Sequence, residues 1–360
     1  MASSPAAVPC SSHHPDHPMS APAPSDLPLL DPAQPASARP APLWRRLIAF
    51  TLDTTLLGAI GYGVGMLLFD WVVGLGLAAR LIGLVLALGY FGLADSRLTG
   101  GRSFGKRLLG LAVVGPDGAP LSIGAATLRA LVLMAPVILN DFDLDEMSPL
   151  VTGLWSFLVI GVGLSLLYLV LFNRPTRQSL HDLVVGARVI DVNPAPAPTP
   201  APAPTPAPAP ALPGRPLRLV HRIVVGLLCA VSIGYGLVLP SLVESSVRLS
   251  ELLVVRNAVR ENPAVRDATV ARRWQKTTGR DEASEAIVIT AVVRQWPADP
   301  EAAARDIAGM VLKQYPQLVG ERPLIVKVAI EFNLGIANYS KSQGIETSAA
   351  TWPKAEPLRS

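Results

Sequence analysis

Long apolar runs separated by short charged or turn-forming segments account for most of residues 43–245. An α-helix rises 1.5 Å per residue, so about 20 apolar residues cross the ~30 Å hydrocarbon core of a bilayer. Runs of this kind predict membrane-spanning helices at about residues 47–69, 79–96, 123–140, 149–172 and 223–243. The pattern therefore predicts an α-helical membrane protein with a four-span core and a fifth span.

A short basic motif follows the first pair of apolar runs, and a weaker copy follows the second pair. The alignment pairs Ser103 with Ser179, Phe104 with Leu180, Gly110 with Gly186, and Val113–Val114 with Val189–Ile190. Lys106 falls on Asp182, so the two copies carry opposite charges at that position. Because both copies end a two-helix hairpin, they predict a core made of two similar halves, related by an axis along the membrane normal. Chance similarity between two Val/Leu/Gly-rich segments is the alternative.

Two local features of the core need an interpretation. Arg80 interrupts the apolar run before the second span. We expect its side chain to snorkel outward, and the alternative is a position deep in the bundle with a partner. Residues 115–118 (Gly-Pro-Asp-Gly) form a turn signal between two apolar strips, which predicts a short hairpin lying against the membrane.

The flanking segments differ from the core in composition. Residues 1–42 are rich in Pro, Ala and Ser and are predicted to be disordered, and residues 193–216 form a Pro-Ala linker. Residues 217–245 carry the fifth transmembrane helix. Residues 246–345 mix amphipathic helices with alternating strands at 265–274, 286–296 and 324–332, which predicts a small soluble α+β domain. Residues 346–360 are predicted to be a disordered tail.

Composition and charge placement agree with a membrane protein. Half of the residues are apolar and only 16% are charged, against about 25% in globular proteins. Arg45 and Arg46 precede the first span, and Arg174 and Arg177 follow the fourth. The positive-inside rule therefore predicts a multi-pass membrane protein with a cytoplasmic N-terminus and a C-terminal domain on the far side. In a two-membrane bacterium this means the inner membrane, with the C-terminal domain in the periplasm. No long basic stripe with interleaved aromatics indicates nucleic-acid binding.

Charged residues near the predicted cytoplasmic end of the core are the candidate site. A charge inside a membrane costs about 2.5–3.5 kcal/mol on insertion scales, so it normally has a partner or a task. Asp53 lies two helical turns after Arg46, about 10 Å along the axis, and so needs a partner from another segment. Lys106 or Arg107 is the predicted partner, and Asp182 would pair with the remaining base or with Arg46.

Two interpretations of this mixed cluster stay open. Its ion pairs could lock the helices and amphipathic segments together. Alternatively, Asp53 takes up and releases a proton or a metal cation, as intramembrane carboxylates do in transporters. Loss of function on mutation alone would not separate the two, because breaking a buried pair typically costs about 3–5 kcal/mol.

Three segments resemble the motifs of the RDD family of bacterial membrane proteins. They run from Trp44 to Asp53, from Gly101 to Gly110, and from Arg177 to Asp182. The family is named for one arginine and two aspartates, which the resemblance places on Arg46 (or the adjacent Arg45), Asp53 and Asp182. The resemblance covers residues 42–192. It implies a membrane domain of a kind described in some members as a cation/proton antiporter.

Two functions follow from these patterns. The first is exchange of protons for a monovalent cation through the core, and four spans are few for a transport path, so a homodimer is expected. The second is a non-transporting scaffold in the lipid bilayer that presents its periplasmic domain for binding or assembly. No nucleophile, base and acid constellation indicates an enzyme, and the sequence predicts neither a cofactor nor a metal site.

Overall fold

The computed structural model describes residues 40–140, 147–174, 176–192, 217–276, 283–320, 322–348, 350, 352 and 356–357. Four helical stretches among them are long and apolar enough to cross a membrane: Leu43–Leu67, Phe69–Ala94, Pro149–Phe172 and Leu219–Leu242. The helix at the third predicted span has 17 residues and is apolar but shorter. The prediction of several membrane helices followed by a β-containing C-terminal domain is confirmed. The predicted number of five membrane crossings is not confirmed, because the third helix is shorter than the other four.

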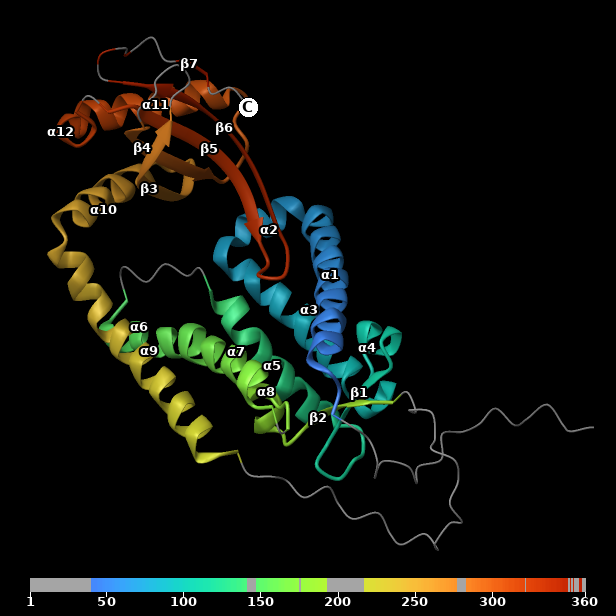
Figure 1. The fold of residues 1–360 in the computed structure, drawn as a ribbon. Coiled ribbons are helices and arrows are strands. Elements are labelled where there is room, and N and C mark those ends of the chain that lie inside the picture. Colours follow the sequence, from blue (N-terminus) through green and yellow to red (C-terminus); the bar gives the residue numbers. More distant parts are fainter. Residues whose placement is uncertain are drawn as a thin grey trace, which may run out of the picture.

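The first two predicted spans form a helical hairpin (Figure 1). It consists of α1 (Leu43–Leu67), α2 (Phe69–Leu75), a 3₁₀ turn (Gly76–Ala78) and α3 (Ala79–Ala94). Arg80 near the start of α3 is 4% exposed, and its Nη1 donates to the backbone carbonyls of Ile138, at 3.0 Å, and Asn140. The last carbonyls of a helix lack an intrahelical partner. The snorkelling prediction was therefore wrong, and Arg80 caps the helix that ends at Leu139.

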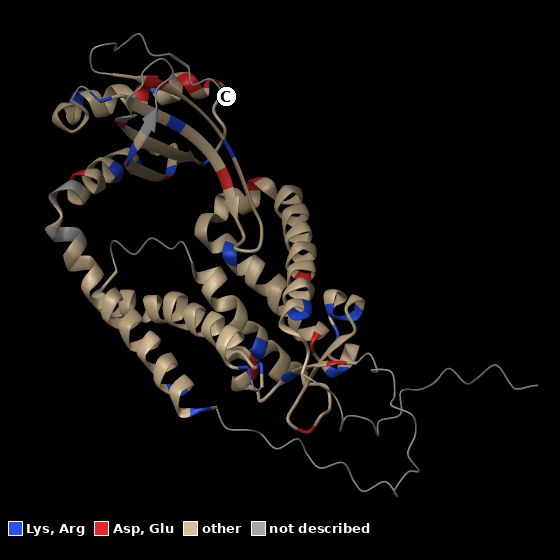
Figure 2. Cartoon of the chain, in the orientation of Figure 1, with Lys and Arg blue, Asp and Glu red and all other residues tan. Residues whose placement is uncertain are grey.

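The second hairpin and one further helix lie beside the first. They comprise α5 (Ile123–Leu139), α6 (Pro149–Ser156), a π-helical segment (Phe157–Gly161), α7 (Val162–Phe172) and α9 (Leu219–Ser245). α9 packs along α6 and α7, where small residues let the backbones approach. A Cβ atom at Gly236 would collide with Ser156 and with the carbonyl oxygen of Thr152. Figure 2 shows that most residues along these helices are uncharged (tan), with the charged residues mainly towards the helix ends.

The two copies of the motif share their local structure. The first forms α4 (Phe104–Leu108) and β1 (Leu111–Val114), and the second forms α8 (Leu180–Val184) and β2 (Arg188–Asp191). Each short helix is followed by a glycine with a positive φ, 62° at Gly110 and 66° at Gly186, a conformation that glycine adopts without strain. β1 and β2 pair with each other, antiparallel, with Val113 opposite Val189. The predicted local hairpin around residues 115–118 was wrong, because the partner of β1 comes from the second copy.

The ordered core begins slightly earlier than predicted. Pro40 forms a β-bridge with Ile190, and the Ala41 amide donates to the carbonyl of Val189 at 3.1 Å. The prediction of disorder is therefore wrong for residues 40–42. Residues 1–39 and the predicted linker at 193–216 lie outside the described residues.

The C-terminal domain is built around one five-stranded sheet in the order β3-β4-β5-β6-β7. Its strands are β3 (Val265–Lys276), β4 (Ala283–Val293), β5 (Leu324–Asn333), β6 (Asn338–Thr347) and β7 (Glu356–Pro357). β4 and β5 are parallel and the other neighbours antiparallel. The three predicted strands are confirmed as β3, β4 and β5. The predicted tail at 346–360 needs correction, because β6 extends to Thr347 and β7 pairs with it.

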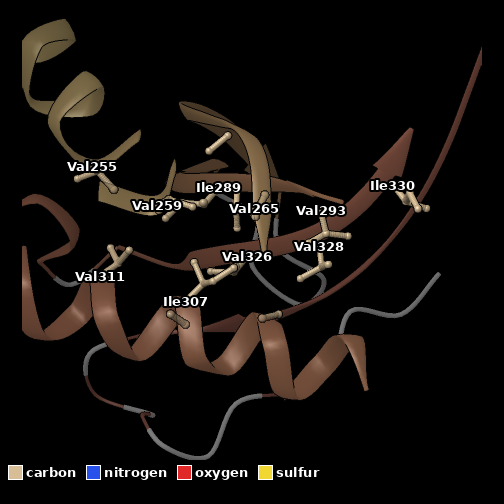
Figure 3. Close-up of a cluster of buried hydrophobic side chains, with 14 of the residues drawn as sticks. Val255, Val259, Val265, Ile289, Val293, Ile307, Val311, Val326, Val328 and Ile330 are labelled. Atoms are coloured by element: carbon tan, nitrogen blue, oxygen red, sulfur yellow. The ribbon is translucent and has the colours of Figure 1, made fainter. Parts of the chain in front are cut away.

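Helices α10 (Val247–Arg260), α11 (Pro300–Gln314) and α12 (Pro316–Val319) complete this domain. Figure 3 shows Val255 and Val259 of α10 and Ile307 and Val311 of α11 directed towards the strands. The same cluster of buried apolar side chains includes Val72, Val73 and Ala79 from α2 and α3. The C-terminal domain thus shares its core with the end of the first helical hairpin.

The β5–β6 hairpin extends from the sheet onto α1, α2 and α3 (Figure 1). Phe332 packs edge-on against Phe69, with ring centroids 6.0 Å apart. Near the hairpin tip, the carbonyl oxygen of Leu334 lies where a Cβ at Gly83 would stand, and the side chain of Ile336 meets Gly61. Glycines on α1 and α3 therefore make room for the hairpin. The sequence did not predict this contact between the hairpin and the helices.

Candidate functional site

A chain of buried ion pairs lies where α4 and α8 meet α1, α3 and α5. The links are Lys106 Nζ–Asp95 at 2.5 Å, Arg129 Nη1–Asp95 at 2.5 Å, Arg129 Nη2–Asp182 at 2.8 Å and Arg46 Nη2–Asp182 at 2.9 Å. All five side chains are at most 11% exposed. Bases and acids alternate along the chain, so Asp95 and Asp182 are each bound by two bases.

The sequence predicted some of these contacts and missed others. The predicted pairing of Asp182 with Arg46 is confirmed. Arg45 instead forms an ion pair with Asp191, so Arg46 is the arginine that joins the cluster. Asp95 and Arg129 were missed because neither lies in one of the two motif copies: Asp95 follows the second apolar run, and Arg129 lies inside the third. The offset that relates Ser103 to Ser179 also relates Asp53 to Arg129, and this signal could have drawn attention to Arg129.

Asp53 lies outside this chain of ion pairs. Its carboxylate is fully buried and accepts hydrogen bonds from the Tyr90 hydroxyl at 2.7 Å, the Gly105 amide at 2.8 Å and the Ser103 hydroxyl. The predicted pairing with Lys106 or Arg107 was wrong, because Lys106 binds Asp95 and the exposed Arg107 donates to the Arg102 carbonyl at 3.1 Å. Within the described part of the chain, Asp53 has no ion pair.

The start of α4 positions these donors. Ser103 precedes the helix, so its side chain and the Gly105 amide both face α1. A Cβ atom at Gly105 would collide with the backbone of Ala49, so glycine allows α4 to approach α1 this closely. Backbone and hydroxyl donors that converge on one carboxylate hold it in place without neutralising its charge.

His181 contributes a neutral imidazole to the cluster. Its Nε2 lies 2.9 Å from Arg129 Nη2, and because an arginine only donates, Nε2 accepts this hydrogen bond and carries no proton. Burial lowers the pKa of His181 to about 3, from 6.5. Desolvation, the largest cause, opposes the charge on this ring; attraction by Asp182 works against it, and Arg129 and Arg46 add repulsion. His181 therefore stays neutral at physiological pH.

Acidification is expected to destabilise the protein through His181. Between pH 6.5 and about 3 the unfolded state binds a proton at this residue and the folded state does not, so stability falls as pH decreases through this window. The slope from one such group reaches at most about 1.4 kcal/mol per pH unit. The apparent unfolding temperature in detergent should fall from pH 7 to pH 5, and His181→Gln should flatten that decline. An equal decline in both proteins would contradict this assignment.

A cavity of about 300 Å³ borders the cluster between α1 and α7. Arg46, Asp53, Lys106, Arg129 and His181 line its polar end. Apolar side chains of α1, α3, α5 and α7 line the remainder: Leu47, Phe50, Phe91, Leu133, Leu166 and Leu167. Among the described residues, no group of three His, Cys, Asp or Glu side chains is arranged to hold a metal ion. The arrangement instead offers one buried carboxylate beside an open space.

Comparison with protein families identifies this part of the chain. The model of the RDD family matches residues 40–186, which run from the first β-bridge to the glycine after α8. The chain contains an RDD-family domain. No curated protein and no solved structure matches the chain.

Within the RDD domain, the three residues that the resemblance singled out take two different positions. Arg46 and Asp182 bind each other at 2.9 Å inside the chain of ion pairs. Among the described residues, the Asp53 carboxylate accepts hydrogen bonds from Tyr90, Ser103 and Gly105 alone. The RDD domain thus separates a cluster in which each acid is bound by two bases from one buried carboxylate that borders the cavity.

Proposed function

We propose that the RDD domain exchanges protons for a monovalent cation, with Asp53 binding the two alternately. The observation that carries this proposal is that Asp53 is fully buried, borders the cavity and, within the described part of the chain, accepts hydrogen bonds only from neutral groups. A buried carboxylate without a base gains from binding a proton or a cation. Asp95 and Asp182 are already neutralised by bases and have no such need.

The groups around Asp53 suit a hard monovalent cation. The Tyr90 and Ser103 hydroxyls each carry lone pairs, and rotation of an O–H bond turns a donor to the carboxylate into an oxygen ligand. Hard cations prefer such oxygen ligands. Protonation of Asp53 would remove the charge that holds the cation, so binding of one would release the other.

A layer of apolar side chains closes the site on the side of the C-terminal domain. It comprises Leu57, Ala87, Phe91, Ala130, Met134 and Ile138, with Ile336 of the β5–β6 hairpin packed against it. The cavity lies on the other side of this layer, next to α4 and α8. The proposed exchange therefore needs a second arrangement in which this layer opens.

The proposed membrane placement has the N-terminus in the cytoplasm and the C-terminal domain in the periplasm of a bacterial inner membrane. It includes α5 as a crossing, and α9 as a crossing outside the core. The clustering of Arg46, Arg174 and Arg177 at one end of the bundle supports this orientation. Two similar halves are supported by the matched α4 and α8, and by the pairing of Val113 with Val189. A homodimer is proposed to complete the path.

A scaffold is the second candidate, and one observation favours it. The C-terminal domain shares its buried core with α2 and inserts its β5–β6 hairpin against α1 and α3. A membrane domain that serves as a rigid base for a binding domain would need such a contact. In that case the ion pairs and Asp53 would serve only to hold the helices together.

Proton flux in proteoliposomes tests the exchange. The full chain is reconstituted with an internal pH-sensitive dye, a proton gradient is imposed, and sodium, lithium or potassium is added outside. Cation-dependent dissipation of the gradient is expected in wild type and should fall at least 100-fold in Asp53→Asn. This substitution keeps the shape of the side chain and its acceptor for the Gly105 amide, so the protein should still fold and insert.

Asp191→Asn is the matched control, because Asp191 pairs with Arg45 and does not line the cavity. It should retain the wild-type flux. Absence of flux in a folded wild type would reject exchange and favour the scaffold. Equal flux in wild type and Asp53→Asn would keep transport but remove Asp53 from the path.

A further inference from the structure

A groove continues from the cavity towards the protein surface between α1 and α7. Both depressions are bordered by Leu43 and Leu47 of α1 and by Val170 of α7. Leu47 and Leu167 on its two walls are 50% and 56% exposed, so the groove opens sideways. α3 and α5 pack closely along each other, whereas α1 and α7 leave this opening. In a bilayer an apolar opening of this kind faces the acyl chains.

The mouth of the groove is basic. Arg174 and Arg177 line it together with Pro42 and Trp44, and no acidic residue lines it. Arg174 is exposed, and Arg177 donates to the carbonyl of Ala41 at 3.2 Å. Neither arginine forms an ion pair with any residue that the structure describes. Two arginines are therefore available to an anion at this position.

The N-terminus of α1 adds to the attraction for an anion. This helix of 25 residues begins at Leu43 without a side-chain cap and without an acidic residue in its first turn. Pro42, Leu43 and Trp44 at this helix start border the mouth of the groove, where the helix dipole favours negative charge. Trp44 is 59% exposed beside it, and tryptophan at such a place marks the membrane–water interface.

We propose that this groove binds one anionic phospholipid from the leaflet on the Arg174 side. The phosphate lies between Arg174, Arg177 and the start of α1, and an acyl chain lies along Leu47 and Val170 towards the cavity. The basic mouth, at the depth of an interfacial tryptophan, matches the anionic head group of such a lipid. The apolar groove that joins it matches an acyl chain. A soluble phosphate would use the mouth and leave the apolar walls empty.

The proposal does not depend on ion exchange. The proposed phosphate contacts lie at the mouth, and Asp53 lines the cavity but not the mouth. The lipid would close the sideways opening between α1 and α7, which separates the polar end from the surrounding acyl chains.

Lipid titration of the full chain in a neutral detergent, followed by native mass spectrometry, tests the site. The probes are dioleoyl phosphatidylglycerol and dioleoyl phosphatidylcholine. These lipids have the same acyl chains, but the head group of the first is anionic and that of the second is zwitterionic. Wild type should bind the first phosphatidylglycerol at least tenfold more tightly than phosphatidylcholine. Arg174→Gln should weaken that step about fivefold, from the loss of one basic contact. Val170→Trp should weaken it at least tenfold by filling the groove.

Arg97→Gln is the matched control, because Arg97 is an exposed arginine that does not line the groove. It should bind like wild type, and all variants should show the wild-type unfolding temperature without added lipid. Equal binding of both lipids, or equal weakening by Arg97→Gln, would overturn the proposal in favour of unselective lipid contact. Displacement of the lipid by millimolar inorganic phosphate would overturn it in favour of a soluble-anion site. Asp53→Asn should keep lipid binding whether or not it loses flux.

Discussion

Replacement of Asp182 by asparagine is expected to destabilise the RDD domain by about 3–5 kcal/mol. Asp182 is fully buried and forms ion pairs with both Arg46 and Arg129. Asparagine preserves the shape and can still accept the hydrogen bond from the Ser179 amide, so the change removes mainly the charge. Two buried guanidinium groups then lose an anionic partner, and Arg46 loses the only one that it has among the described residues.

Thermal and denaturant unfolding of the full chain in detergent measure this effect. Asp70→Asn is the matched control, because Asp70 is exposed in the first turn of α2 and should contribute about 1 kcal/mol or less. A loss of stability in Asp182→Asn no larger than in Asp70→Asn would mean that the chain of ion pairs does not hold the domain together. The expected result would place Asp182 in a structural role, in contrast to Asp53.

This contrast shows which parts of the site could be read from the sequence. Arg46 and Asp53 share a helix, so their separation follows from helix geometry. The partner of Asp53 depends on how α4 docks on α1, and that docking is set by Gly105 and by the Ser103 hydroxyl. The basic segment after the second predicted span made Lys106 a reasonable partner for Asp53, yet Lys106 forms its ion pair with Asp95. Charge alone does not predict which of several nearby pairings forms.

The fold shows the same limit. Apolar runs and strand alternation predicted most helices and three strands, because burial imposes a period on the local sequence. The pairing of β1 with β2 and the capping of α5 by Arg80 join segments far apart in the chain, and no local pattern encodes them. The repeat was the one long-range signal, since it aligned Val113 with Val189, and these residues face each other across the two strands.

Replacement of Gly83 by leucine is expected to release the β5–β6 hairpin from the membrane domain. A Cβ atom at Gly83 would overlap the carbonyl oxygen of Leu334, which is backbone and cannot rotate away. The hairpin must therefore move, and Phe332 and Ile336 lose their contacts with α1. Amide hydrogen exchange in residues 333–338 should accelerate at least tenfold, because exchange reports local opening of this kind.

Gly89→Leu is the control on the same helix, since nothing lies within 4 Å of a Cβ at Gly89. It should leave hydrogen exchange in the hairpin unchanged, and equal exchange in the two variants would contradict the observed docking. Flux through Gly83→Leu then tests whether the hairpin takes part in the proposed exchange. Ile336 packs on the apolar layer that closes the Asp53 site, so a hairpin that helps to close the path would alter cation-dependent flux on release. Unchanged flux would mean that the hairpin does not help to close the path.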